Sequence, residues 1–446
     1  GGFDPTKYCD KNGIIDTVTI YLNPTPRIDF VLSTDTVVCD TSDYNLDLSI
    51  GNPSFIGTPR YIIHAEHDGN PGDVSGVFAD GEYDLDAFLS NTLINNTRHL
   101  KVITYNIKPV FRSVNGHNPD CDKGIDTTIR IYLNPTPVFD SITISDTVIC
   151  NESVVEFTLY NTQITTGNII YDLSTDYSVA DVTGVEAENT YSPVSYPHTI
   201  TNTLNNSSLL IQDIIYEFLP RINDATHGVI CDKGISDEVT AKVVPTLSVT
   251  ADPMTYIGGR NIRCYNEENG EIRLSPTGGY YLKDYTYEWL KDGSPFSQNT
   301  DTIKNLGIGK YTYRIEDHIG CYFIDSLILT QPDDFVNDDS VKNEICVGRS
   351  DGKIFIDVSG ATPAYDYEWR GPDFFTSNES DSLVGLQSGL FFLTVEDVNE
   401  CMFKDTFDIK APFEVSITPL ISRYGDYNIK CTGEENGWIE SNVLGT

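Results

Sequence analysis

The chain has 446 residues and carries 66 acidic against 29 basic side chains, which gives a formal net charge of −37. A surface of this charge repels nucleic acid and anionic lipid, so we expect no nucleic-acid partner. No apolar run reaches the roughly 18 residues of a membrane span, so we expect no membrane insertion in this segment. The length predicts several modules, because one hydrophobic core seldom serves so long a chain.

The ten cysteines follow a repeating register. Eight of them form two longer and two shorter spacings, of 82, 81, 57 and 55 residues: Cys39–Cys121, Cys150–Cys231, Cys264–Cys321 and Cys346–Cys401. We call the members of each pair the first and the late cysteine of a module. The spacings predict two kinds of module, each present twice, with one internal disulfide per module. Because no C-x-x-C occurs, disulfides and an extracellular, oxidising compartment are favoured over zinc or free-thiol chemistry.

Two cysteines are left over. Cys9 opens CDKN, which is similar to CDKG at 121 and 231, whereas Cys431 opens CTGEENG, which is similar to CYNEENG at 264. Each matches half of a module. We therefore expect Cys9 and Cys431 to be unpaired by truncation, in a chain that is a slice of a longer array.

The first module type is recognised by segments that recur after about 110 residues. The strings IYLNPTP at 20–26, TVVCD at 36–40 and NTLINNT at 91–97 return at 131–137, 147–151 and 202–208. Alternating Val, Ile and Leu in residues 17–23 predict a half-buried last strand, and the following prolines predict a stiff linker. The boundaries are 1–26 for the end of a truncated module, 27–136 for module 1 and 137–245 for module 2.

The second module type occupies 246–333 (module 3) and 334–413 (module 4), and 414–446 begins a truncated third copy. Its opening C-x4-NG-x-I covers Cys264–Ile272 in module 3, with Asp in place of Asn in module 4. A Tyr/Trp strand and a G-x-[YF] segment that ends at the late cysteine follow. Tyr285, Tyr287 and Trp289 share one face of the predicted strand. We expect this face to pack in the core; the alternative is a platform that stacks on a ligand.

These motifs resemble a known family. The second module type is similar to the SprB repeat of Bacteroidota surface proteins, with its cysteine opening, Y-x-Y-x-W centre and terminal Gln331-Pro332. Module 4 departs from this pattern at Asn399-Glu400 and at Ala411-Pro412. The first type resembles PKD-like, immunoglobulin-like modules in three segments of each copy: Leu93–Thr97, Tyr105–Pro109 and Cys121, then Leu204–Ser208, Tyr216–Pro220 and Cys231.

The resemblance implies an all-β, linear array of immunoglobulin-like or PKD-like sandwiches within a giant gliding-motility adhesin. Such an adhesin is a substrate of the type IX secretion system and lies extracellularly, at the outer-membrane surface. Its partners would be the secretion and gliding machinery and, through other parts of the chain, external surfaces or polysaccharide. The segment itself would be a structural shaft that bears load and holds a binding tip away from the cell.

We expect no enzyme, because nucleophile, metalloprotease, Walker and dinucleotide motifs are missing from the sequence. One alternative is an array of carbohydrate-binding modules, in which exposed aromatic residues such as Trp438 would stack on sugar rings. Another is an accessory region of a secreted hydrolase, whose catalytic domain would lie elsewhere.

Two groups of residues are candidate metal sites, and no cofactor is assigned. His64 and His67 flank an Ala-Glu pair before Asp68, but on a strand they would face opposite sides and could not chelate one ion. Acidic residues also recur in register, namely Asp10, Asp122 and Asp232, and Glu316-Asp317 and Glu396-Asp397. These fit either structural calcium or turns that are closed by aspartate side chains.

A further motif, Asp-[Ser/Thr] followed by a small or apolar residue, resembles the O-glycosylation signal of exported Bacteroidota proteins. It predicts O-glycans at eight residues: Thr17, Thr36, Thr127, Ser141, Thr147, Thr302, Ser326 and Ser382.

Overall fold

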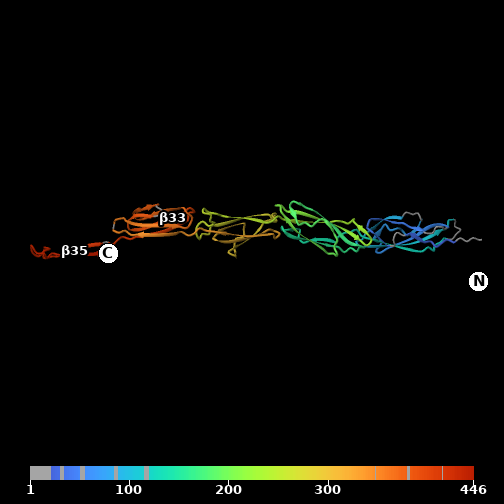
Figure 1. The fold of residues 1–446 in the computed structure, drawn as a ribbon, viewed down its shortest axis with the longest axis horizontal. Coiled ribbons are helices and arrows are strands. Elements are labelled where there is room, and N and C mark those ends of the chain that lie inside the picture. The colour runs from blue at the N-terminus through green and yellow to red at the C-terminus, as the bar shows by residue number, and fades with distance from the viewer. Residues whose placement is uncertain are drawn as a thin grey trace, which may run out of the picture. The chain divides into compact units, whose positions relative to one another are not determined.

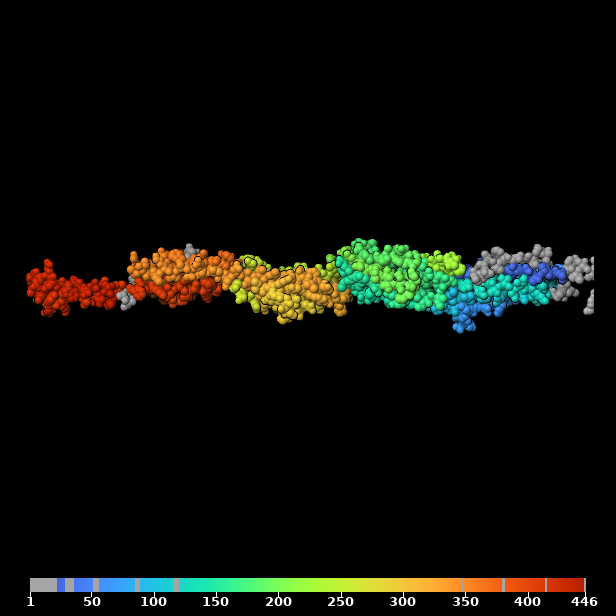
Figure 2. All heavy atoms as spheres, turned by 60° about the horizontal axis from the view of Figure 1, so that its bottom comes forward, coloured from blue at the N-terminus to red at the C-terminus, as the bar shows by residue number. Residues whose placement is uncertain are grey.

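The structure is a computed structural model that describes residues 22–30, 35–50, 56–84, 89–114, 120–346, 348–378, 382–413 and 415–445. These residues form strands, turns and one short 3-10 turn, η1 (Pro372–Phe374), so the predicted all-β class is confirmed. No helix in the described residues could cross a membrane. The chain divides into two compact units, Gly1–Pro245 and Thr246–Thr446. Figure 1 shows the strands and Figure 2 the molecular surface.

Module 1 folds as two sheets around an apolar core. Its larger sheet has the order β2 (Asp35–Val38), β10 (Thr127–Leu133), β9 (Lys101–Arg112), β5 (Thr58–His67) and β7 (Gly81–Asp84). The facing strands are β3 (Ser42–Leu46), β8 (Leu89–Asn95) and β6 (Val74–Ser75), and β1 (Ile28–Phe30) pairs with β4 (Ser49–Ile50). Strand β9 alternates buried and half-buried side chains, so its buried face supplies Ile103, Tyr105 and Ile107 to the core.

Module 2 repeats this topology. One sheet has the order β12 (Val148–Ile149), β20 (Asp237–Val243), β18 (Gln212–Asp224), β14 (Asn168–Asp176) and β16 (Asn189–Tyr191), with β19 (Val229–Cys231) beside β18. The other has the order β11 (Ser141–Ile144), β13 (Ser153–Tyr160), β17 (His198–Asn206) and β15 (Val182–Thr183). In both modules the first strand of the larger sheet runs parallel to the last strand, as β2 does to β10 and β12 to β20.

Modules 3 and 4 share a second topology. Module 3 pairs β21 (Ser248–Pro253), β22 (Gly270–Thr277) and β25 (Thr302–Leu306) against β24 (Ser294–Pro295), β23 (Thr286–Lys291), β26 (Gly309–Glu316) and β27 (Tyr322–Leu329). Module 4 pairs β28 (Val336–Lys342), β29 (Gly352–Ser359) and β32 (Ser382–Leu386) against β31 (Thr376–Ser377), β30 (Tyr365–Arg370), β33 (Gly389–Asp397) and β34 (Met402–Ile409). A final hairpin, β35 (Val415–Ile421) with β36 (Ile439–Gly445), reproduces the pairing of β21 with β22.

The tryptophans of β23 and β30 lie in the cores. Trp289 is 2% exposed and Trp369 is 0% exposed, and Tyr285 and Tyr287 are half-buried against the same core. The indole N–H of Trp289 donates to the carbonyl of Thr300 at 3.0 Å. The prediction that this aromatic face packs in the core is therefore confirmed. Trp438, which was named above as an exposed aromatic residue, is 50% exposed.

The predicted pairing of cysteines within modules is wrong. Cys39 bonds to Cys231, and Cys264 bonds to Cys401, so each of these disulfides joins two successive modules. Cys150 and Cys321 are also disulfide-bonded, whereas Cys121, Cys346 and Cys431 are free thiols among the described residues. The free state of Cys431 was predicted; Cys9 lies outside the described residues. Each of the four predicted pairs contains a cysteine that is bonded elsewhere, so none of them forms: Cys39–Cys121, Cys150–Cys231, Cys264–Cys321 and Cys346–Cys401.

Strand length explains the error. Cys39 follows Val38, which pairs with Leu133 of β10. Leu133 in turn pairs with Lys101, at one end of β9, so Cys39 lies near that end. Cys121 pairs with Phe111, at the other end of β9. Ten residues of strand separate Lys101 from Phe111, about 33 Å, and a disulfide needs Cα atoms within about 7 Å. The first and late cysteines of one module therefore lie at opposite poles.

Candidate functional site: the module junctions

In the first compact unit the disulfide stands within a set of contacts between modules 1 and 2. The ammonium group of Lys233 donates to the carbonyl of Thr41 at 3.4 Å, two residues from each bonded cysteine. The guanidinium group of Arg98 in module 1 donates to the Asp140 carboxylate at 2.5 Å and to the carbonyl of Phe139 at 3.1 Å. The N–H of Leu100 donates to the carbonyl of Ile164 at 2.7 Å. The junction is therefore held on several sides.

The proline-containing linker is fixed by side-chain amides. Asn134 is 0% exposed, and its amide oxygen accepts from the N–H of Thr166 at 3.0 Å while its NH₂ donates to the Thr166 hydroxyl at 2.9 Å. Gln163 donates to the carbonyl of Thr136 and accepts from the N–H of Val138, both at 2.9 Å. The segment predicted as a stiff linker is thus also bonded to the module that follows it.

The same chemistry recurs at the earlier copy of this segment. Asn23 donates to the carbonyl of Ile56 at 2.7 Å and accepts from its N–H at 2.8 Å. Pro26 accepts from the N–H of Ile125 at 3.1 Å, as Pro137 accepts from that of Ile235 at 3.0 Å. The Asn of the N-P-T-P segment is therefore a junction residue in both copies, a role that sequence reasoning missed.

A buried amide explains the second recurring segment, NTLINNT and NTLNNSS. Asn206 is 2% exposed, and its NH₂ donates to the carbonyls of Leu210 at 2.8 Å and Val243 at 2.9 Å. Its N–H donates to the side chain of Asn151, the residue after Cys150. In module 1, Asn95 makes the corresponding bonds to His99, Leu133 and Asp40. This amide ties the loop beside the first cysteine to the last strand of the module.

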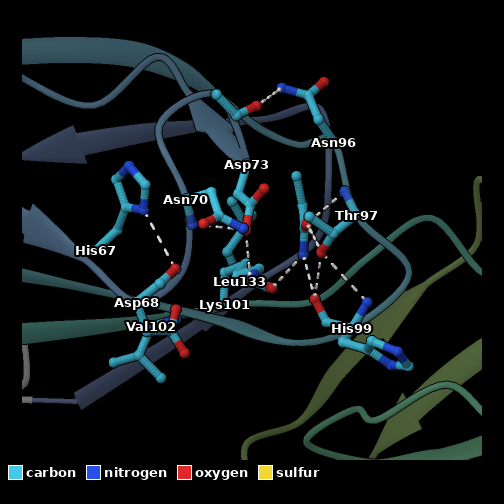
Figure 3. A network of polar contacts seen from close by, with 12 residues as sticks. His67, Asp68, Asn70, Asp73, Asn96, Thr97, His99, Lys101, Val102 and Leu133 are labelled. Atoms are coloured by element: carbon cyan, nitrogen blue, oxygen red, sulfur yellow. Dashed lines mark hydrogen bonds and ion pairs between the residues drawn. The ribbon is translucent and has the colours of Figure 1, made fainter.

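Figure 3 shows a network of polar contacts in module 1 that includes Asn96, Asp73 and Lys101. Asn96 donates to the carbonyl of Gly72 at 3.0 Å, and Asp73 accepts from Lys101 at 2.8 Å and from the N–H of Asn70 at 3.0 Å. The hydrogen bond from Lys101, followed by that from Asn70, lowers the pKa of Asp73 below its ordinary value. The network fastens the loop after β5 to the loop that faces module 2.

The Asp73 carboxylate gives a prediction on pH. Because its folded pKa is lowered, its contribution to stability is present above the unfolded pKa of about 3.9 and is lost as the pH falls through the folded pKa. A carbon-detected NMR titration should place the Asp73 midpoint below that ordinary value, and Lys101→Met should raise it. An unchanged midpoint in the variant would show that Lys101 does not hold this carboxylate.

Removal of the buried amide should destabilise module 2. Asn206→Ala leaves the carbonyls of Leu210 and Val243 without this donor, so we expect a loss of about 2–3 kcal/mol in the free energy of unfolding. The neighbouring Asn205 is exposed, and Asn205→Ala should change it by less than about 0.5 kcal/mol. Urea denaturation followed by tyrosine fluorescence measures both variants, and equal losses would refute the assigned role.

In the second compact unit the junction joins modules 3 and 4 in another way. Beside the Cys264–Cys401 disulfide, Asn399 donates to the carbonyl of Ile257 at 3.0 Å, and Arg263 lies 3.7 Å from the Glu400 carboxylate. Asn399 and Glu400 are the positions at which module 4 departs from the repeat pattern. These departures therefore supply contacts to the preceding module.

The recurring acidic residues of modules 3 and 4 close turns. The carboxylate of Asp317 accepts from the N–H groups of Tyr280, Ile319 and Cys321 at 2.7–3.0 Å. Asp397 accepts in the same way from Thr362, Asn399 and Cys401 at 2.8–2.9 Å. Both carboxylates thereby shape the turn that presents the late cysteine, in agreement with the turn interpretation. Asp122 lies against the guanidinium of Arg112, and Asp10 is outside the described residues.

The histidines of β5 engage separate partners. The Nδ1 atom of His64 lies 2.5 Å from the Asp80 carboxylate, whereas that of His67 lies 3.2 Å from the carbonyl of Asp68. The structure therefore does not bring the two rings together on one ligand. Within the described residues no group of three or more His, Cys, Asp or Glu side chains is placed to hold a metal ion.

The predicted O-glycosylation residues lie on the surface wherever the structure describes them. Ser141 and Thr147 are exposed, and Thr36, Thr127, Thr302, Ser326 and Ser382 are half-buried. Thr127, Ser141, Thr302 and Ser382 each begin a strand. Thr17 lies outside the described residues. Glycosylation itself stays a prediction.

An open groove of about 450 Å³ lies beside β23 in module 3. Aromatic, aliphatic and charged side chains line it together: Tyr281, Leu282, Lys283, Asp284, Tyr285, Tyr287 and Asp301. Tyr281 and Leu282 are exposed. Module 4 keeps the two strand tyrosines as Tyr365 and Tyr367, but its loop before them is two residues shorter.

Comparison with known proteins identifies part of the chain. Residues 339–374 match the family model of the SprB repeat. This match lies in module 4 and includes its Y-x-Y-x-W strand. A search of curated proteins found no match.

A search of solved structures found weak matches to extracellular fragments of other proteins. A C-terminal 282-residue fragment of intimin, solved with an intimin-binding domain, has a TM-score of 0.32 and 10% identity over 45% of this chain and 67% of that one. The D1–D4 ectodomain fragment of ICAM-5 has a TM-score of 0.31 and 9% identity over 87% and 100%. The ectodomain of human desmocollin-1 has a TM-score of 0.25 and 10% identity over 87% and 79%. At these values the likeness is one of tandem sandwich folds alone.

Proposed function

We propose that this chain is a non-enzymatic shaft segment of a giant bacterial cell-surface adhesin that acts in gliding motility and surface attachment. The observation that carries the proposal is the covalent bridging of successive modules, by Cys39–Cys231 and by Cys264–Cys401. A disulfide within one sandwich would protect only that sandwich, whereas a bridge between two resists their separation under tension. A shaft needs this property more than it needs a pocket.

Other features support the same proposal. The SprB repeat in module 4 connects the chain with the surface proteins that carry this repeat. The disulfides fit an extracellular location, and the charge of −37 keeps an extended surface protein soluble. We propose accordingly that the type IX secretion system exports the chain, that the gliding machinery moves it, and that other parts of the protein contact external surfaces or polysaccharide.

Live cells can test surface display and movement together. Beads coated with antibodies against residues 137–413 should attach to intact cells and be carried along their surface. Beads coated with antibodies against a cytoplasmic protein of the same cells are the control. Binding that requires permeabilised cells would refute surface display, and beads that bind but stay fixed would refute a role in gliding while leaving attachment in place.

The groove of module 3 favours a second candidate, carbohydrate binding. Tyrosine rings and neighbouring carboxylates suit the apolar faces and the hydroxyl groups of uncharged sugars, and Tyr281 and Leu282 are open to solvent. Binding to a panel of neutral polysaccharides should be lost in Tyr281→Ala if this site operates. Val336→Ala, at an exposed residue of module 4, is the control. If the unaltered chain binds none of these polysaccharides, carbohydrate binding is refuted and the shaft role is the one candidate that is left.

A further inference from the structure

The two inter-module disulfides follow one rule: the first cysteine of a module bonds to the late cysteine of the next module. Cys39 of module 1 meets Cys231 of module 2, and Cys264 of module 3 meets Cys401 of module 4. The two bridges occur in different module types with different topologies. The rule therefore depends on where each module places its cysteines, at opposite poles, and not on one particular fold.

The free thiol of Cys346 occupies the same kind of loop as the bonded Cys264. The carbonyl of Cys264 accepts from the N–H of Glu267 at 3.2 Å, and that of Cys346 accepts from Arg349 at 3.1 Å. The residue before each cysteine donates its N–H to an Asn or Asp side chain, Arg263 to Asn269 at 3.0 Å and Ile345 to Asp351 at 2.9 Å. The cysteine loop is thus pre-shaped in the absence of a disulfide.

The loop of Cys346 also lies at the pole from which the chain leaves module 4. Asn343 accepts from the N–H of Lys410, the residue directly after β34, just as Asn261 of module 3 accepts from Thr330 directly after β27. Cys346 is exposed there. The hairpin β35–β36 follows, and its cysteine, Cys431, lies in a third loop of this kind, in which Lys430 donates to Asn436 at 3.1 Å.

We propose that the Cys346 thiol is the attachment site for the late-cysteine turn of a further repeat module placed next along the same chain. The partner is a turn of the form seen at Asp317 and Asp397, in which an aspartate side chain accepts from the N–H of a cysteine four residues later. Cys121 is the converse case. It pairs with Phe111 as Cys231 pairs with Ile222, so it presents a late cysteine to a first cysteine in the module before it.

The bond requires an oxidant, which we take to be a small disulfide such as glutathione disulfide. The Cys346 thiolate attacks one sulfur atom of this disulfide and releases one glutathione. The late cysteine of the next module then attacks the Cys346 sulfur and releases the second glutathione. Two protein thiols thereby lose two protons and two electrons, and one glutathione disulfide becomes two glutathione thiols.

An extended chain tests the proposal. Residues 1–413 are followed by a second copy of residues 333–413, in which Cys346→Ser removes the competing thiol and Met402→Leu gives the copied Cys401 peptide its own mass. After refolding with glutathione disulfide, non-reducing peptide mapping should find Cys346 bonded to the copied Cys401. The original Cys401 should stay bonded to Cys264, as in the structure.

The controls separate the alternatives. In the 1–446 chain Cys346 should react with maleimide, and in the extended chain it should not. Cys346→Ser in the extended chain should leave the copied Cys401 reactive. If Cys346 and the copied Cys401 both stay reactive while the copied Trp369 shows buried fluorescence, the proposal is wrong; a copy that fails this fluorescence test is replaced by residues 246–332, with Cys321 as the late cysteine. Chains linked to one another on a non-reducing gel would overturn the assignment to the same chain.

Discussion

When the oxidised chain is stretched between its ends, the residues enclosed by the two disulfide loops should not extend. Reduction of the disulfides should release this length. Residues 39 and 231 are 192 apart in sequence and residues 264 and 401 are 137 apart, but each pair is joined through sulfur. At about 3.5 Å per extended residue, reduction should add about 670 Å and about 480 Å to the fully unfolded length. Optical tweezers or force microscopy, with and without dithiothreitol, measures both increments.

The two increments can be assigned separately by substitution. Because Cys150 and Cys321 lie inside these loops and are also disulfide-bonded, each test removes two cysteines. With Cys150→Ser and Cys231→Ser together, the first length should appear without reductant, while the second should still require it. With Cys321→Ser and Cys401→Ser together, the assignment should reverse. Two increments that match the spacings within modules, 82 or 81 residues and 57 or 55 residues, would instead restore the pairing expected from the cysteine register and would contradict the junction bridges.

Loss of the module 4 tryptophan should unfold or nearly unfold that module. Trp369 is fully buried and packs against Phe407, with ring centroids 5.6 Å apart. Trp369→Ala should therefore lower the free energy of unfolding by about 3–5 kcal/mol, through lost burial and the cavity left behind. Calorimetry and the tyrosine near-UV circular dichroism of the chain report this loss.

A neighbour on the same sheet is the matched control. Phe392 lies in β33, opposite Arg370 of β30, and half of its surface is exposed. Phe392→Ala should cost about 1 kcal/mol or less, because little apolar area leaves the core. If instead Trp369→Ala were tolerated and a soluble glycan lost its binding, the aromatic face would be a ligand platform, contrary to its position in the core.

The class of fold and the aromatic cores could be predicted because period-2 alternation reports directly on a two-sided sheet. The string that ends before Asn134 alternates apolar and polar residues. This string forms β10, in which alternate side chains are buried as the pattern predicts. Tyr285, Tyr287 and Trp289 followed the same rule. Such patterns are local, so a single sequence contains them.

Cysteine partners could not be predicted in the same way, because pairing depends on which poles of the modules meet. The spacing between Cys39 and Cys121 reflects the length of a module. It does not indicate whether each cysteine bonds within its own module or to a neighbouring one. A clue was present in the lengths of the central strands, since β9 alone has 12 residues. The Asn side chains at the junctions, Asn134 and Asn206, were visible only as recurring letters, and their hydrogen-bond partners lie far away in sequence.

The parallel pairs β2–β10 and β12–β20 have a mechanical consequence. The chain enters the larger sheet at one end of its first strand and leaves at the opposite end of the last, because the two strands run in the same direction. Once the Cys39–Cys231 bridge is reduced, tension applied along the chain slides these neighbours past each other, and the hydrogen bonds between them are loaded together. If the two terminal strands were antiparallel, the hydrogen bonds between them would break one after another, and the pair would separate at lower force. The terminal strand pairs of modules 1 and 2 are thus loaded in shear.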